Sequence, residues 1–419
     1  MMSLPNDGSG RAPVVIVSPT TSVTSGVEVT KKLVGAAVAF GDLLAGTLGP
    51  NGLDKMMYKT NGQTTVTNDG AKIVAELLVK HPAAKAFVAL AESQENACGD
   101  GVTSCLLIAS NLMREAGRLL DKKLHPLVLV EGYQRALDIT LQTLESKIIT
   151  IKPDSIEHLR KVAKTAMSGT SAEAGGDLMA DLVVNAAQLV AGEKNGHLHI
   201  STEDVRMAKR GVGSIGDSRL IAGLIIEKRL DLDRLPKSLD AGNVVVLSCP
   251  LEIESTVRDV EIEVDNPEKW ASFMDIEEER LQHKAQQIIS SGANLVFTAE
   301  GVEPRILHAL VDEGIFVLGN LEKSGAEDIA LATGAQMIDH LDDISEEALG
   351  NFTQLKIETL EGAEGRRERI HLLAGQQTGI ATIDVGGGDG VASEEVIRGL
   401  YDALCSVTSA METGEVLTG

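Results

Sequence analysis

Three short segments decide the fold of this chain: TLGPNG at residues 47–52, VTNDGA at residues 66–71 and GDGVTS at residues 99–104. Each lies at the boundary of a predicted helix, where backbone groups lack a partner within the helix. The glycines of the first segment let the backbone approach a ligand closely. The second places a carboxylate just ahead of a helix, and the third leads from an aspartate between two glycines into a helix start with two hydroxyls. Free amides at a helix N-terminus attract phosphate, and the carboxylate would hold Mg²⁺.

Each segment taken alone has an ordinary structural explanation. The first is a helix stop, and Asp69 in the second is more often an N-cap than a catalyst. Asp100 in the third leaves both explanations open, because an aspartate at this position serves equally well as a cap. The order and spacing of the three segments along one chain are far more specific than any one of them.

The residues around these segments predict a helical region. From residue 27 to 44 apolar side chains recur at helical spacing, and the pattern ends at the Gly-Pro-Asn-Gly turn. Asn61 and Gly62 predict a hairpin within residues 54–67. Residues 1–25 are rich in Ser, Thr, Gly and Pro, which predicts a loose arm with one strand at residues 14–17. Further helices are predicted at residues 71–78, 83–96, 102–120, 126–147, 154–166 and 176–191.

A different pattern begins near residue 220. Strands alternate with helices as far as residue 373, which predicts an α/β domain inserted into the helical one. Gly292 ends the longest helix of this part, and a helix returns at residues 393–411. The predicted strands are residues 243–247, 295–298 and 315–318, and the predicted helices are residues 267–291, 304–313 and 326–333.

In combination, the three segments resemble the nucleotide site of the group II chaperonins, the family of the thermosome and the eukaryotic cytosolic chaperonin. The resemblance covers about residues 27–419 and includes LVKHPAAKAFVALAESQ, LHPLVLVEGYQRAL, GANLVFTAEGVEPRILHALVDEGIFVL, ATGAQMI and the stretch around Tyr401-Asp402-Ala403-Leu404. It implies an α+β multidomain chaperonin fold with a helical equatorial domain, a small intermediate domain and an inserted α/β apical domain. It also implies an ATP-dependent protein-folding chaperone whose ring subunits couple ATP binding and hydrolysis to lid closure over unfolded clients.

The resemblance implies five segments along the chain. Residues 1–150 would form the N-terminal half of the equatorial domain, and residues 151–219 the first part of the intermediate domain. Residues 220–373 would form the apical substrate-binding and lid domain, and residues 374–412 the return part of the intermediate domain. Residues 413–419 would begin the C-terminal half of the equatorial domain, which continues in relatives, so that half is expected to be missing here.

The resemblance also implies roles for single residues. Asp100 would coordinate Mg²⁺, and K⁺ is a further candidate cation, as in relatives. Asp402, on the intermediate domain, would orient or deprotonate the attacking water, and Asp69 would assist near the γ-phosphate. Three aspartates beside a polyphosphate need a cation for charge balance. The residues expected along the phosphates of ATP are Thr47, Leu48, Gly49 and Pro50 on one side and Gly101, Val102, Thr103 and Ser104 on the other.

Three residues depart from the family pattern around the phosphates. Asn51 stands where many members carry lysine, and Val102 replaces the first threonine of a usual GDGTT run. Thr170 occupies the position of a lysine that senses the γ-phosphate in many archaeal members. Each change removes a charge or a hydroxyl, so weaker nucleotide binding or slower turnover is expected.

Composition limits the partners. The 419 residues include 61 acidic and 38 basic ones, and the formal net charge of −23 repels nucleic acid and anionic membrane surfaces. The four cysteines form neither a metal-ligand nor a disulfide pattern, and no run reaches the roughly 18 apolar residues of a bilayer span, so a cytoplasmic location is expected. The expected partners are unfolded or partly folded proteins and the identical or different subunits of a chaperonin ring. Residues 251–279, which include Trp270 and Phe273, resemble the protrusion that forms the lid.

Two other classes of function are open at this point. A non-hydrolysing paralogue that binds the ring or holds clients would keep this fold; Thr170 and the early end favour it, and the three aspartates speak against it. A nucleotide-dependent oxidoreductase is suggested by GGGDG at residues 386–390. That cluster lacks a following G-x-x-G spacing, and in a chaperonin it is the turn before the helix at residues 393–411.

Overall fold

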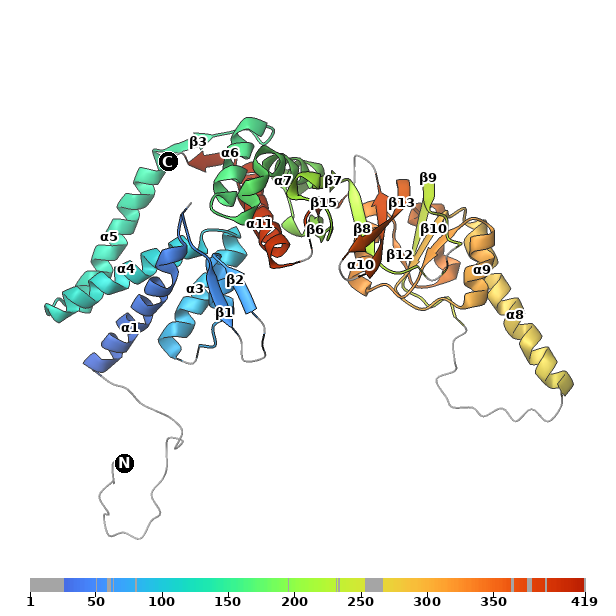
Figure 1. The fold of residues 1–419 in the computed structure, drawn as a ribbon, viewed down its shortest axis with the longest axis horizontal. Helices are drawn as coiled ribbons and strands as arrows, with labels where there is room; N and C mark the ends of the chain where they lie inside the picture. Colours follow the sequence, from blue (N-terminus) through green and yellow to red (C-terminus); the bar gives the residue numbers. More distant parts are fainter. Residues whose placement is uncertain are drawn as a thin grey trace, which may run out of the picture.

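The computed structural model describes residues 26–417 apart from positions 50, 59–61, 63, 80, 195, 231, 233, 253–266, 363–364, 375–378 and 389. Figure 1 shows three regions in a row: a helical region, a middle region of helices and short strands, and an α/β region. The chain passes through the middle region twice, once on its way to the α/β region and once on its way back.

The helical region packs around one stripe of α1. Ala37, Phe40 and Leu44 of this helix are buried, and their spacing of three and four residues places them on one face. Phe40 stacks on Phe87 of α3, with ring centroids 5.4 Å apart. Strands β1 and β2 pair antiparallel, with Lys55 opposite Thr67. The elements are α1 (Val27–Leu44), β1 (Lys55–Tyr58), β2 (Thr64–Thr67), α2 (Gly70–Ala75), α3 (Pro82–Cys98), α4 (Val102–Asp121) and α5 (Pro126–Glu145).

The middle region is built around α11, whose residues Leu400, Ala403, Leu404 and Val407 are completely buried in its core. Helices α6 and α7 pack against α11. Strand β15 lies in the centre of a three-stranded sheet, parallel to β6 and antiparallel to β7. Antiparallel pairs also form between β3 and β16 and between β4 and β5. The elements are β3 (Ile148–Thr150), α6 (Ile156–Met167), α7 (Gly176–Val190), β4 (Gly192–Lys194), β5 (His197–His199), β6 (Val205–Lys209), β7 (Arg219–Ile221), β15 (Ala381–Val385), α11 (Val391–Thr413) and β16 (Glu415–Leu417).

The α/β region contains a seven-stranded mixed sheet with the order β11-β10-β9-β13-β14-β8, and β12 also pairs with β9. Successive side chains of a strand point to opposite faces, so Val244 and Val246 of β9 join one core with α10, while Val245 and Leu247 join another with α8 and α9. The elements are β8 (Gly223–Glu227), β9 (Ser238–Leu247), α8 (Pro267–Ser290), β10 (Leu295–Thr298), α9 (Pro304–Asp312), β11 (Phe316–Leu318), α10 (Lys323–Thr333), β12 (Met337–Ile338), β13 (Gly350–Gly362) and β14 (Gly365–Leu373).

Most predicted elements are present at or near their predicted bounds. The hairpin and the seven predicted N-terminal helices form, although α2 ends at Ala75, before the predicted residue 78. The α/β alternation is confirmed, but the long antiparallel strands β13 and β14 and the sheet of the middle region were not predicted. The strand predicted at residues 14–17 and residues 253–266 of the predicted lid segment lie outside the described residues.

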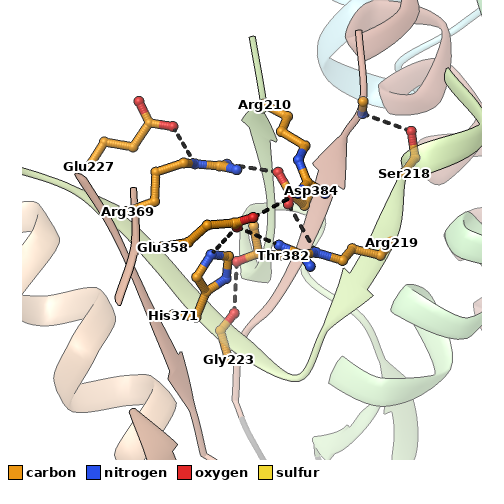
Figure 2. Close-up of polar contacts among 11 residues, drawn as sticks. Arg210, Ser218, Arg219, Gly223, Glu227, Glu358, Arg369, His371, Thr382 and Asp384 are labelled. Carbon is orange, nitrogen blue, oxygen red and sulfur yellow. Dashed lines mark hydrogen bonds and ion pairs between the residues drawn. The ribbon is translucent and has the colours of Figure 1, made fainter. Parts of the chain in front are cut away.

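A network of ion pairs joins the α/β region to the middle region, as Figure 2 shows. Arg369 of β14 is completely buried and donates from Nη2 to Asp384 Oδ1 of β15 at 2.7 Å and from Nε to Glu227 Oε1 of β8 at 3.0 Å. Arg219 of β7 donates from Nε to Asp384 Oδ2 at 3.1 Å and from Nη2 to Glu358 Oε2 of β13 at 2.9 Å. Because buried charges are tolerated only beside their partners, this network fixes how the two sheets meet.

Candidate nucleotide site

The three sequence segments and α11 meet at one cavity of about 150 Å³. The loop between α6 and α7, which includes Thr170, completes its wall. Pro50 lies outside the described residues. Every other residue predicted for the site lines the cavity: Thr47, Leu48, Gly49, Asp69, Asp100, Gly101, Val102, Thr103, Ser104 and Asp402.

The starts of two helices face this cavity. Asp69 caps α2, and its carboxylate accepts hydrogen bonds from the amides of Ala71 at 2.9 Å and Lys72 at 3.2 Å. Gly101 precedes α4 with a φ of 82°, which favours glycine, and the carboxylate of Asp100 accepts a hydrogen bond from its amide. The cap explanation is therefore correct for Asp69. It does not exclude a second role, because a carboxylate has more lone pairs than these amides use.

Two glycines allow the segments to approach closely. A Cβ on Gly70 would lie 2.4 Å from Oγ1 of Thr103, and a Cβ on Gly99 would lie 2.3 Å from Sγ of Cys405. Gly99 also ends α3 with a φ of 66°. These contacts bring α2 against α4 and the α3–α4 loop against α11, so the two glycines set the width of the cavity.

Helix α11 is tied to the helical region by polar contacts. Arg398 donates from Nη1 to Asp69 Oδ2 at 3.1 Å, and Thr67 donates to Glu395 Oε2 at 3.2 Å. A further link runs from Asn68, whose Nδ2 donates to the carbonyl oxygen of Gly169 at 2.8 Å. The helical and middle regions therefore share the cavity wall.

The cavity is strongly acidic. Burial, then the charges of Asp69, Asp100 and Glu95, raise the pKa of Asp402 from 3.8 to about 8, and Arg398 only partly opposes this. Burial is also the main cause that raises the pKa of Asp100 and of Glu95, and nearby carboxylates add to it. A low-dielectric site with this many carboxylates favours protons or a metal cation.

Residues 40–419 match the model of the TCP-1/cpn60 chaperonin family. The chain is 34% identical over 407 residues to the thermosome subunit beta of Archaeoglobus fulgidus, which covers 97% of this chain and 74% of that protein. The chain belongs to the TCP-1/cpn60 chaperonin family. It is also 34% identical to a thermosome subunit of Methanopyrus kandleri, over 92% of this chain and 70% of that protein. A thermosome subunit of Pyrococcus horikoshii is 33% identical, over 97% and 73% of the respective chains.

The family membership confirms the predicted group II chaperonin subunit, its α+β multidomain fold and its class of function, ATP-dependent protein folding. Gly386, Gly387 and Gly388 of the GGGDG segment follow β15, and the amide of Gly386 donates to Ser218 Oγ at 2.9 Å. No helix of the described residues is both long enough and apolar enough to cross a membrane.

Three charged residues that line the chaperonin cavity were not predicted from the sequence: Glu95 of α3 and Glu395 and Arg398 of α11. Positions 395, 398 and 402 are three and four residues apart, so helical spacing places them on the face of α11 that carries Asp402. That spacing was the available signal for Glu395 and Arg398. Glu95 carries no such signal, because only the packing of α3 brings it to the cavity.

The acidic residues are not arranged as a ready-made metal centre. Among the described residues, no group of three or more His, Cys, Asp or Glu side chains is positioned to bind one ion. Mg²⁺ usually takes one or two protein carboxylates together with water and substrate phosphates. Asp100, at the start of α4, is the carboxylate best placed for such an ion, because the phosphate-attracting amides of the same helix start lie beside it.

Proposed function

We propose that this chaperonin subunit binds ATP with Mg²⁺ in the cavity between α4 and α11 and hydrolyses it in the cytoplasm, within a ring that encloses unfolded proteins. One observation carries the proposal: α11 brings Asp402 to the cavity formed by the three N-terminal segments, although about 300 residues separate them in the sequence. The domain boundaries predicted from the sequence are part of this proposal.

The phosphates would lie against backbone amides at the start of α4. Gly101, Val102, Thr103 and Ser104 form this start, and the dipole of a 20-residue helix favours an anion there. Leu48 and Gly49 would approach from the other side; Gly49 has a φ of 87°. When bound, Mg²⁺ would supply the positive charge that balances the phosphates and the carboxylates, with Asp100 as its protein ligand.

Asp402 would position the attacking water. Its raised pKa means that without a cation it holds a proton near neutral pH and cannot act as a base. This pKa would be lowered by a Mg²⁺ ion held close to the carboxylate, so Asp402 would be ionised only when Mg-ATP is present. Asp69, fixed by the amides of α2, would assist from the opposite wall.

The experiment compares Asp402→Ala with Asp100→Ala. Asp402→Ala should bind Mg-ATP nearly as well as the unsubstituted chain and release phosphate about 10²-fold more slowly. Asp100→Ala should lose affinity for Mg-ATP itself. Asp42→Ala removes an exposed carboxylate of α1 outside the cavity and serves as the control. Equal loss of binding in the first two variants would contradict the assignment, and an unsubstituted chain without nucleotide binding would contradict the proposal.

A further inference from the structure

Arg398 is the one basic residue among the described residues that line the cavity. It shares that wall with five carboxylates: Asp69, Glu95, Asp100, Glu395 and Asp402. The other residue expected to meet the terminal phosphate, Thr170, has its hydroxyl engaged locally. It donates to the carbonyl oxygen of Met167 at 2.7 Å and brings no positive charge. Among the described residues of the cavity wall, the cationic side chain available to an anion therefore comes from α11.

The contacts of Arg398 leave part of its guanidinium free. Nη1 donates to Asp69 at 3.1 Å, but Nε lies 3.6 Å from Glu395 Oε1, beyond hydrogen-bond distance. Nε is buried and has no hydrogen-bond partner. A buried donor without a partner is unfavourable, so an acceptor that enters the cavity gains from it.

Asp69 can release Arg398 without losing all its partners. Its carboxylate also accepts hydrogen bonds from two amides of α2, which hold it in place. The planar fork of arginine matches the oxygens of a phosphate group. Asp69 therefore serves as a temporary partner that keeps the guanidinium at the cavity.

We propose that Arg398 binds the terminal phosphate of ATP and thereby makes the site prefer ATP to ADP. This inference rests on the proposed function. Arg398 precedes Asp402 by one helical turn on the same face of α11, so a phosphate that holds Arg398 also holds Asp402 at the cavity. Arg398 of α11 supplies the positive charge that Thr170 does not.

The test is calorimetry with Mg²⁺ and either ADP or a non-hydrolysable ATP analogue. Arg398→Gln should weaken the ATP analogue about 10- to 100-fold, the range for a hydrogen bond to a charged group, and should weaken ADP much less. Arg398→Lys should keep part of the preference for ATP, because it keeps the positive charge but loses the planar fork. Arg118→Gln, which removes an exposed arginine of α4 paired with Glu115, is the matched control and should change neither affinity.

The outcomes separate the two proposals. If the unsubstituted chain binds neither nucleotide, the proposed function fails and the role of Arg398 falls with it. If that chain binds both nucleotides and Arg398→Gln keeps the same ratio of affinities, only the role of Arg398 is refuted.

Discussion

Replacing Asp402 by asparagine should stabilise the chain increasingly as the pH rises, when no Mg²⁺ or nucleotide is present. The pKa of Asp402 is about 8 in the folded chain and 3.8 in the reference state. Between these values the folded chain keeps a proton that the unfolded chain has released. The free energy of unfolding therefore falls as the pH rises through this window, and the loss is complete above pH 8.

The magnitude follows from the same two values. At about 1.4 kcal/mol for each pH unit, the interval from 3.8 to about 8 sets an upper limit of about 6 kcal/mol on the cost of ionising Asp402 in the folded chain. Asp402→Asn has no proton to lose at this position. Its advantage over the unsubstituted chain should widen by up to about 1.4 kcal/mol per pH unit between pH 5 and pH 8.

Hydrogen exchange of the α11 amides measures this difference locally, which matters because a multidomain chain does not unfold in one step. Both proteins are compared at the same pH, which cancels the intrinsic dependence of exchange on pH. EDTA keeps the cavity free of metal ions. The control is Asp177→Asn, because the hydrogen bond from Lys164 lowers the pKa of this exposed carboxyl. The difference in α11 protection between Asp177→Asn and the unsubstituted chain should not widen between pH 5 and pH 8. If the difference in α11 protection between Asp402→Asn and the unsubstituted chain stays constant over the same range, the reasoning is refuted.

Three further predictions concern other parts of the molecule. Gly99→Ala should destabilise the chain by about 1–3 kcal/mol in thermal denaturation, because the methyl group would collide with Cys405 at a positive φ. Thr170→Lys should tighten ATP relative to ADP in calorimetry, because the added charge gains most from the γ-phosphate; an unchanged ratio means that position 170 does not reach the phosphate. Arg369→Met should cost about 3–5 kcal/mol in urea denaturation, because Asp384 would remain buried without its closest cation, and no loss would show that the network carries little energy.

The helices and the short buried strands could be predicted because their signals are local. Leu295–Thr298 is an apolar run that directly follows the helix stop at Gly292, and all four of its residues are buried. Strands β13 and β14 gave no such signal. Arg369, Ile370, His371 and Leu372 are all buried, so both faces of β14 are covered and one of them is polar. Alternation of apolar and polar residues fails as a guide wherever ion pairs replace an apolar core.

The candidate site shows the same division between local and tertiary signals. Asp69 and Asp100 stand at helix starts within short glycine-containing segments, which is a pattern visible in the sequence. Arg398 meets Asp69 across 329 positions of sequence, and nothing near either residue indicates the other. The resemblance to a family supplied Asp402, and the structure then supplied the neighbours of Asp402 on the same helical face.

Helix α11 and strand β15 form one continuous connection between the cavity and the α/β region. One face of α11 carries Arg398 and Asp402 at the cavity, while Leu400, Ala403 and Leu404 are completely buried in the core of the middle region. Because packed cores shift as units, α11 cannot tilt toward the cavity without moving the helices and the sheet around it. Asp384 of β15, just before α11, is bonded to the buried Arg369 of β14. A movement of α11 at the cavity would therefore be transmitted to the seven-stranded sheet through a buried ion pair, because any slip would separate Asp384 from Arg369 while both side chains remain buried.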